Sequence, residues 1–183
     1  MDWERFAVID VETTGLVPQR DRVVEIACVL VDAGRIGDRW STLVNPGIPI
    51  PQRATQIHGI DDDAVAHAPS LANTLDTLMR RTDGRIVAAH NAGFDLSFLP
   101  ELAPPRAICT MRLARIVAPD APNHKNQTLR AYFNIDRYLD ADAVAHRALG
   151  DALVTAHVLL ACRRSCTPAT WMKALQASAL SVF

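Results

Sequence analysis

The sequence has few cysteines, and their spacing matches no cross-linked or zinc-binding pattern. The four are scattered through 183 residues, as Cys28, Cys109, Cys162 and Cys166. The closest pair has the form Cys-x-x-x-Cys, and the second pair that a structural zinc site needs is missing. A chain of this length buries roughly 70% of the surface that its unfolded state exposes, so its core needs no metal or disulfide. We therefore expect neither a structural zinc nor disulfides.

Long apolar runs are also missing. No segment approaches the roughly 18 consecutive apolar residues of a membrane span. The first six residues, Met-Asp-Trp-Glu-Arg-Phe, contain no basic region followed by an apolar stretch, which is the pattern of a secretion signal. These absences predict a protein of the reducing cytoplasm, without a membrane partner.

An excess of basic charge is the third feature that the sequence lacks. Its 19 Lys and Arg residues against 20 Asp and Glu residues give a net charge of −1 at pH 7. This balance excludes a protein that holds nucleic acid through general positive charge. The same charge balance is compatible with a nucleic acid that is held by bound cations and a local basic patch. The function therefore has to be inferred from the residues of a candidate active site.

The pattern of apolar residues changes along the chain, from strands to alternating strands and helices. Three early strands in a meander are followed by two short strands, each with a helix after it, and then by two long helices. The predicted strands are 5–9, 23–31, 40–44, 85–89 and 106–109, and the predicted helices include one beginning after Ser70 and two over about 147–163 and 168–180. This order predicts one α/β domain over residues 1–183, with helices packed on a mixed five-stranded sheet.

Acidic residues follow two of the predicted strands. Asp10 and Glu12 are two residues apart at the end of the first strand, so an extended backbone places both carboxylates on one face, about 6–7 Å apart. Gly15, in the turn that follows, is free to adopt a positive φ and to bring the backbone close to a ligand. Asp95 comes just after the strand at 85–89. The alternative interpretations are a polar strand end before a turn, and Asp95 as the N-cap of a short helix over 96–99.

His146 and Asp151 begin the long helix near residue 147. Five positions on a regular helix differ by about 140° in direction, so both side chains reach one site only if His146 lies on the loop or helix entry. If the helix began near Asp142, His146 would be a solvated helix residue instead. Joined with the other acids, the cluster holds four carboxylates and one imidazole.

Four carboxylates in one pocket need cations to neutralise them. Two divalent ions cancel the formal charge of −4, and carboxylate oxygens without thiolates favour Mg²⁺ or Mn²⁺. Such a pair of ions activates a water and stabilises the leaving oxygen in phosphoryl chemistry. An imidazole is a suitable general base for that water.

These residues resemble the motifs of the DnaQ-like 3′-to-5′ exonucleases with four carboxylates and a histidine (DEDDh), which include the proofreading epsilon subunit of bacterial DNA polymerase III. The resemblance covers about residues 4–163. The matching motifs are Asp10-Val-Glu12-Thr-Thr-Gly15-Leu16, Ile57-His-Gly-Ile60, His90-Asn91-Ala-Gly-Phe94-Asp95 and His146-Arg-Ala-Leu-Gly-Asp151. The resemblance implies a ribonuclease-H-like fold and hydrolysis of nucleic acid from a 3′ end with release of nucleoside 5′-monophosphates.

The resemblance also implies roles for individual residues. It makes Asp10, Glu12, Asp95 and Asp151 the metal ligands and His146 the general base. The residues that it assigns to the terminal nucleotide are Thr13, Thr14, Gly15, Leu16, His58, Asn91 and Phe94. The alternatives for two of them are that Leu16 is buried in the core and that His58 stabilises a turn.

Basic residues and the C-terminal segment leave further alternatives open. Lys125 and Arg130, with Arg112 and Arg115 upstream, either hold phosphates or form an ordinary solvated surface. Asp61, Asp62 and Asp63 are interpreted as a helix N-terminus, not as ligands. Thr167 and Pro168 predict the start of the last helix, whose face of Trp171, Leu175, Ala179 and Val182 is expected to pack on the domain. The terminal Ala179-Leu-Ser-Val-Phe183 only faintly resembles a sliding-clamp-binding peptide, and the short C-terminal segment does not favour a polymerase tether.

Three functions are therefore compared. The favoured one is a 3′-to-5′ exonuclease acting on single-stranded 3′ ends of DNA. The second is an RNA 3′-end trimming enzyme similar to ribonuclease T or oligoribonuclease. The third is a non-catalytic module that binds a polymerase or a sliding clamp, which the presence of all five site residues disfavours.

Overall fold

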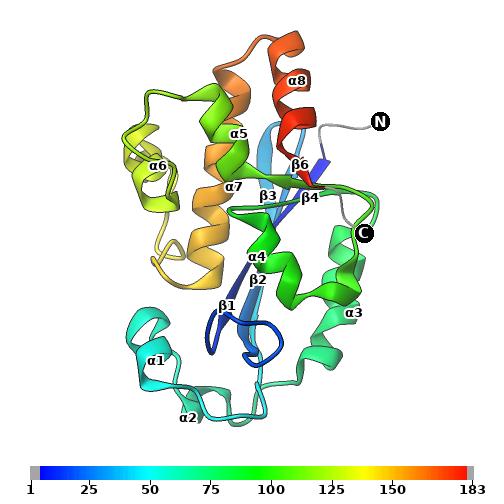
Figure 1. Ribbon diagram of the computed structural model, residues 1–183, viewed down its shortest axis with the longest axis vertical. Helices are drawn as coiled ribbons and strands as arrows, with labels where there is room; N and C mark the ends of the chain where they lie inside the picture. Colours follow the sequence, from blue (N-terminus) through cyan, green and yellow to red (C-terminus); the bar gives the residue numbers. More distant parts are fainter. Residues whose placement is uncertain (1–4, 181–183) are drawn as a thin grey trace.

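A mixed sheet of six strands forms the centre of the molecule in the computed structural model, which describes residues 5–180 (Figure 1). The strands lie in the order β3-β2-β1-β4-β5-β6. Their bounds are β1 Arg5–Thr13, β2 Val23–Asp32, β3 Arg35–Leu43, β4 Ile86–Ala89, β5 Ala107–Cys109 and β6 Ala179–Leu180. The first three strands form an antiparallel meander, β4 runs parallel to β1 and β5 parallel to β4, and β6 is antiparallel to β5. The predicted α/β class and mixed sheet are confirmed.

The sixth strand departs from the five-stranded prediction. The last helix was expected to extend over 168–180, but it ends at Ser178, and Ala179–Leu180 pairs with β5 instead. The backbone of Ala179 is extended, with φ −63° and ψ 144°. Because β5 offers unpaired N–H and C=O groups at the edge of the sheet, two residues of extended chain are enough to cover it.

Helices cover both faces of the sheet. They are α1 Gln52–His58, α2 Asp62–Val65, α3 Leu71–Thr82, α4 Ala92–Phe98, α5 Thr110–Val117, α6 Asn126–Tyr132, α7 Ala148–Arg164 and α8 Pro168–Ser178, with short 3₁₀ turns at Pro100–Leu102 and Ile135–Tyr138. The helices α5, α6 and α7 lie on one side of the sheet and α3 on the other (Figure 1). The predicted helices after Ser70 and over 147–163 are confirmed to within one or two residues, and Asp61 caps α2, as expected, by accepting a hydrogen bond from the Ala64 N–H.

The alternation of side chains along β1 divides the core into two layers. Phe6 and Val8 pack with α7 and its neighbours, whereas Ala7, Ile9 and Val11 pack toward α3 and α4. The helix α7 is apolar around most of its surface because it lies between the sheet and the outer helices α5 and α6. Its position on β1 and β2 brings its first turn beside the end of β1 that carries Asp10 and Glu12.

The C-terminal helix begins at the predicted residues and packs on the domain as expected. Thr167 Oγ1 accepts a hydrogen bond of 3.2 Å from the Thr170 N–H, and Pro168 is the first helical residue. Trp171 and Leu175 are buried against the domain, but Ala179 is exposed because it belongs to β6. Val182 lies outside the described residues. No helix within 5–180 is long and apolar enough to cross a membrane.

Candidate active site

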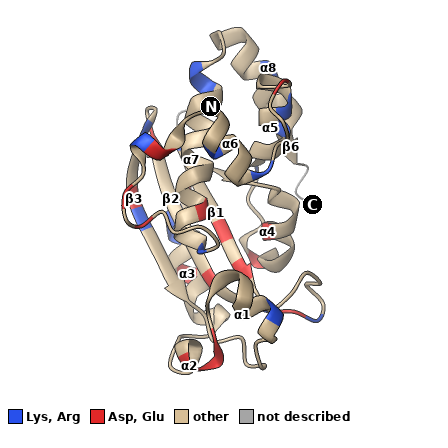
Figure 2. Ribbon diagram, turned by 90° about the vertical axis from the view of Figure 1, so that its left-hand side faces the viewer, with Lys and Arg blue, Asp and Glu red and all other residues tan. Residues whose placement is uncertain are grey.

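Three carboxylates meet at the end of β1. Asp10 and Glu12 lie on the same face of the extended strand, as their spacing predicted, and Asp151 lies in the first turn of α7. One carboxylate oxygen of each residue lies within 4.8 Å of the others. Figure 2 shows the acidic segments of β1 in the middle of the molecule, next to α7 and α4. The structure therefore brings together residues that are up to 141 positions apart in the sequence.

Asp95 adjoins this group but is bound differently. It lies in the first turn of α4, it is buried, and its Oδ1 accepts a hydrogen bond of 3.2 Å from the Val11 N–H of β1. The helix begins at Ala92 after Asn91, so the alternative that Asp95 caps a helix over 96–99 is wrong. The bond ties Asp95 to the strand residue between Asp10 and Glu12, and the charge of Asp95 contributes, after burial, to the raised pKa of Asp10.

Burial and mutual repulsion raise the pKa values of these acids. Desolvation, and then the charges of the neighbouring carboxylates, raise the pKa of Asp10 well above its usual value and that of Glu12 to about 8. Burial raises the pKa of Asp95 to about 7 and also raises that of Asp151. Such a cluster of partly buried carboxylates is unfavourable when it is ionised without a positive partner. A divalent cation fits the cluster, because it supplies the missing positive charge and prefers oxygen ligands.

His146 lies on the loop before α7, as the shared site requires. The helix begins at Ala148, so the alternative of an earlier start near Asp142 is wrong. His146 has φ +58° and is exposed, and its backbone N–H donates a hydrogen bond of 3.1 Å to Asp151 Oδ2. This bond ties the backbone of His146 to one of the acids of the cluster.

The start of α6 also contacts the acidic cluster, which the sequence did not predict. Gln127 Nε2 donates a hydrogen bond of 2.8 Å to Asp151 Oδ1, and Asn126 Nδ2 donates one of 3.1 Å to the Asp151 carbonyl. These bonds fix both the side chain and the backbone of Asp151. Amide residues in a polar segment give no sequence signal for such a contact, because the partner is 24 or 25 positions away.

A hollow of about 670 Å³ opens beside Glu12. Six of the seven residues expected to bind a terminal nucleotide line it, namely Thr13, Thr14, Gly15, Leu16, His58 and Phe94. Leu16 is 78% exposed, so the alternative of a core position is wrong. His58 is buried and also stabilises a turn, because its Nδ1 accepts a hydrogen bond of 3.1 Å from the Ile60 N–H. Asn91, the seventh residue, begins α4 with φ +68° and does not line the hollow.

Gly15 is needed for a different reason from the one expected. The sequence left Gly15 free to adopt a positive φ, but it is not among the glycines with positive φ in the structure. A Cβ at this position would collide with the carboxylate of Asp21, which folds under the turn and accepts a hydrogen bond of 2.8 Å from the Val17 N–H. The glycine therefore lets a buried acid support the loop that carries Leu16.

Within residues 5–180, no hydrogen bond or ion pair joins the four basic residues that could hold phosphates into one cluster. Arg130 Nε donates a hydrogen bond of 2.6 Å to Asp136, and Arg115 contacts the sulfur of Met111. Lys125 lies at the start of α6, and Arg112 on α5. A role in phosphate binding stays a prediction for all four.

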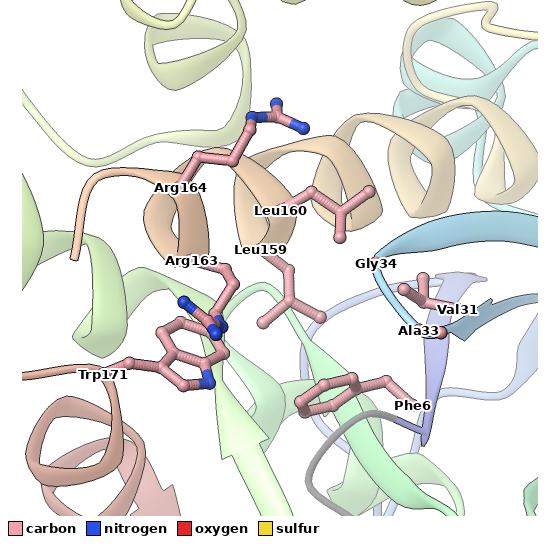
Figure 3. Close-up of a pocket in the computed structure, with 9 residues that line it drawn as sticks. All are labelled: Phe6, Val31, Ala33, Gly34, Leu159, Leu160, Arg163, Arg164 and Trp171. Atoms are coloured by element: carbon pink, nitrogen blue, oxygen red, sulfur yellow. The ribbon is translucent and has the colours of Figure 1, made fainter. Parts of the chain in front are cut away.

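A second, smaller hollow lies at the other end of β1 (Figure 3). Its volume is about 260 Å³, and its walls include Phe6, Leu159 and Trp171, with Arg163 and Arg164 at α7. None of the residues that line it is acidic, and none is a predicted site residue. The chemistry is therefore expected at the opposite end of the strand.

Comparison with known proteins assigns the family. A family model described as exonuclease (RNase_T) matches residues 7–159. The chain belongs to the exonuclease family. A solved structure described as Exonuclease X in complex with 5′ overhanging duplex DNA is 33% identical to this exonuclease, with a TM-score of 0.76 over 93% of this chain and 99% of that one. The nuclease domain of 3′hExo, a DEDDh family member bound to rAMP, has a TM-score of 0.73 at 17% identity and supports the ribonuclease-H-like fold.

Relatives of this exonuclease include parts of much longer proteins. A DNA polymerase III subunit epsilon-like protein from Rhodobacter capsulatus is 38% identical over 170 residues, which cover 87% of this chain and 24% of that protein. A DNA polymerase III PolC-type protein from Caldanaerobacter subterraneus is 34% identical over 162 residues, 85% of this chain and 11% of the relative. This chain thus spans about a tenth to a quarter of the length of these relatives. The family match thus places the chain among the nucleases as a family member, over residues 7–159.

Proposed function

We propose that the protein is a metal-dependent 3′-to-5′ exonuclease that hydrolyses phosphodiester bonds at single-stranded 3′ ends of DNA and releases nucleoside 5′-monophosphates. The observation that carries the proposal is the convergence of Asp10, Glu12 and Asp151 within 4.8 Å beside a hollow lined by the predicted nucleotide-binding residues. The Exonuclease X structure, at 33% identity, is bound to DNA, which supports DNA as the substrate. We take residues 1–183 as one exonuclease domain, with a nuclease core over 4–163.

The acidic side chains are proposed to hold two divalent cations, Mg²⁺ or Mn²⁺. Asp10, Glu12, Asp95 and Asp151 offer only oxygen ligands, which these hard ions prefer. When bound, such ions lower the pKa of a water and stabilise negative charge on phosphate oxygens. The hydrogen bonds from Val11 to Asp95 and from Gln127 to Asp151 hold two of the carboxylates in fixed orientations.

His146 is proposed to accept the proton of the attacking water. Its loop position beside Asp151 leaves the imidazole exposed, so it can approach a substrate that lies over the acidic cluster. Only neutral imidazole accepts a proton, so the proposed base acts in its neutral form.

The hollow is proposed to take the terminal nucleotide. Leu16 presents an exposed apolar side chain, and Phe94 lines the same hollow. Apolar and aromatic surfaces accept the faces of unpaired bases with little regard to sequence. A base that has left a duplex can reach these surfaces, which supports single-stranded ends as the substrate.

A time course with end-labelled strands tests this proposal. Single-stranded DNA and RNA of one sequence, labelled at either end, are incubated with Mg²⁺ or Mn²⁺ and the full chain. We expect stepwise shortening from the 3′ end with DNA as the better substrate, no cleavage in EDTA, and normal cleavage by Asp32→Asn, whose acid lies at the far end of β2. Faster cleavage of RNA would assign the protein to RNA trimming. No cleavage of either polymer would favour a module that binds a polymerase or a clamp.

Removal of divalent cations should make the stability of the protein depend on pH. The folded-state pKa values of about 8 for Glu12 and about 7 for Asp95 are raised, so the folded chain holds protons that the unfolded chain releases. This stability is present below about pH 4 and is lost as the pH rises through 7 to 8. In EDTA we expect the melting temperature to fall between pH 6 and 8.5, and Mg²⁺ to restore several degrees, more at pH 8.5 than at pH 6.

A variant of the acidic cluster supplies the control for this pH series. Glu12→Gln removes one of the raised groups, so the fall between pH 6 and 8.5 should be shallower than in the original chain. An equal slope in both proteins would show that other groups cause it. A melting temperature that Mg²⁺ leaves unchanged at pH 8.5 would contradict cation binding at this cluster.

A further inference from the structure

A buried acid next to the cluster belongs to none of the predicted motifs. Glu25 lies on β2 directly opposite Glu12 on β1, so both side chains point to the same face of the sheet. Glu25 is only 4% exposed, and its charge raises the pKa of both Asp10 and Glu12. Two acids directly opposite each other are unfavourable, so this carboxylate needs a positive partner.

Arg147 is that partner, and it follows His146 in the chain. Its guanidinium binds Glu25 through two hydrogen bonds, Nη2 to Oε1 at 2.7 Å and Nε to Oε2 at 3.0 Å. The Ala148 N–H at the start of α7 donates a third bond, of 2.9 Å, to Oε2. Glu25 therefore binds both the side chain of the N-cap residue and the first helical amide. Paired bonds of this kind fix an orientation as well as supplying energy.

Contacts at both ends position the loop over residues 140–147, which ends with His146 and Arg147. At its beginning, Arg39 Nη1 binds Asp140 Oδ2 at 2.6 Å and Asp142 Oδ2 at 3.5 Å. Gly150 packs against the carbonyl of Val144, and the His146 N–H binds Asp151 Oδ2. The hydrogen bond from His146 uses an oxygen of Asp151 that is proposed to bind a cation. This bond and the cation therefore compete for the same carboxylate. The bonds of Glu25 use no proposed metal ligand. Like the ion pairs of Arg39, they stay available when Asp151 is engaged elsewhere, and they act on the residue directly after His146.

We propose that Glu25 and Arg147 are a positioning pair, which holds the loop of His146 over the acidic cluster independently of the metal ligands. The expected effect on kcat rests on the proposed function. The expected effect on the structure of the loop does not depend on any substrate. The pair is a property of three-dimensional packing, because its members are 122 residues apart. Arg147 is 41% exposed in its side chain, so substitution there leaves the buried core intact.

The test compares Glu25→Gln, Arg147→Gln and Arg147→Lys with the original full chain. Displacement of a reacting group by about 1 Å costs on the order of 100-fold, so we expect kcat to fall roughly 10- to 100-fold in both Gln variants while KM changes less than about threefold. Arg147→Lys keeps the charge but not the paired bonds, and should recover part of kcat. The double variant should be no worse than the poorer single variant, because one pair is lost in each case.

A second measurement follows the loop without any substrate. Amide hydrogen exchange at residues 140–148 should become faster in each Gln variant, with the Ala148 amide affected most in Glu25→Gln. Arg85→Gln is the matched control, because Arg85 makes a comparable bond of 2.7 Å to Asp32 at the other end of the sheet. Its kcat should change less than about twofold, and its loop exchange should stay as in the original chain.

Other results of these experiments would overturn either the positioning pair or the proposed function. A raised KM with kcat unchanged in Arg147→Gln would mean that Arg147 binds the nucleic acid, and additive losses in the double variant would mean that the two residues act separately. Either result overturns the positioning pair, as does unchanged exchange over 140–148. An inactive original chain would instead overturn the proposed function, while the exchange measurement still decides on the pair.

Discussion

Asp10→Asn is expected to lower turnover by at least about 1,000-fold and to raise the melting temperature of the metal-free protein. The loss of turnover reflects one missing oxygen ligand, worth several kcal/mol in the transition state, and about 4 kcal/mol corresponds to 1,000-fold. The gain in stability follows from the raised pKa of Asp10, which burial and the charges of Asp95, Asp151 and Glu12 cause. At pH 8 the neutral amide removes this repulsion. Each kcal/mol gained raises the midpoint by roughly 2–4 °C.

Melting curves in EDTA and in Mg²⁺, measured beside single-turnover cleavage, check both parts of this prediction. His146→Gln is the comparison variant, because it should lose most turnover and yet keep the stabilisation by Mg²⁺. If Asp10→Asn retained full metal-dependent activity, the assignment of the site would be wrong. If His146→Gln lost its response to Mg²⁺ as completely as Asp10→Asn, His146 would be a metal ligand and not the base.

Gly150→Ala is expected to reduce kcat by about 100-fold and to destabilise the protein by about 2 kcal/mol. A Cβ at residue 150 would overlap the backbone carbonyl of Val144 in the loop that leads to His146. Backbone atoms do not swing aside as the end of a flexible side chain does, so the loop or the first turn of α7 has to move. His146 and Asp151 are both carried on the segments that move.

Gly93→Ala is the matched control for stability. Gly93 is exposed in α4, and a Cβ there has no neighbour within 4 Å. Alanine inside a helix is favoured over glycine by up to about 1 kcal/mol, so this variant should be as stable as the original chain or more so. Denaturant melts give both changes in stability, and cleavage kinetics give kcat for Gly150→Ala. An unchanged kcat with the expected loss of stability would show that the loop tolerates displacement.

The sequence predicted those parts of the molecule that depend on local pattern. The strand that ends with Asp10 and Glu12 was recognisable because its apolar residues form a continuous run before the acids. The five-residue spacing showed that His146 has to precede α7 if it shares a site with Asp151, and the structure confirms that it does. In both cases neighbouring residues decide the structure, so one segment contains the information.

The contacts that support the site could not be predicted in this way. Glu25 and Arg147 meet only because α7 lies across β2, and nothing near either residue in the sequence indicates the other. The reason for a glycine at position 15 is another example. The carboxylate of Asp21 occupies the space that a Cβ would need, and the local sequence does not show this contact. The strand β6 replaced the end of a predicted helix because the free edge of β5, not the local sequence, determines its conformation.

The distribution of the acidic side chains along the chain has a consequence for biosynthesis. Asp10 lies on the first strand and Asp151 on the penultimate helix, so the cluster exists only after α7 has docked on β1 and β2. A nascent chain that lacks α7 therefore holds no assembled ligand set, so the proposed chemistry cannot begin on the ribosome before α7 has been made and has docked on the sheet. Cations that bind the finished cluster then stabilise the folded state by mass action, which couples maturation to activation.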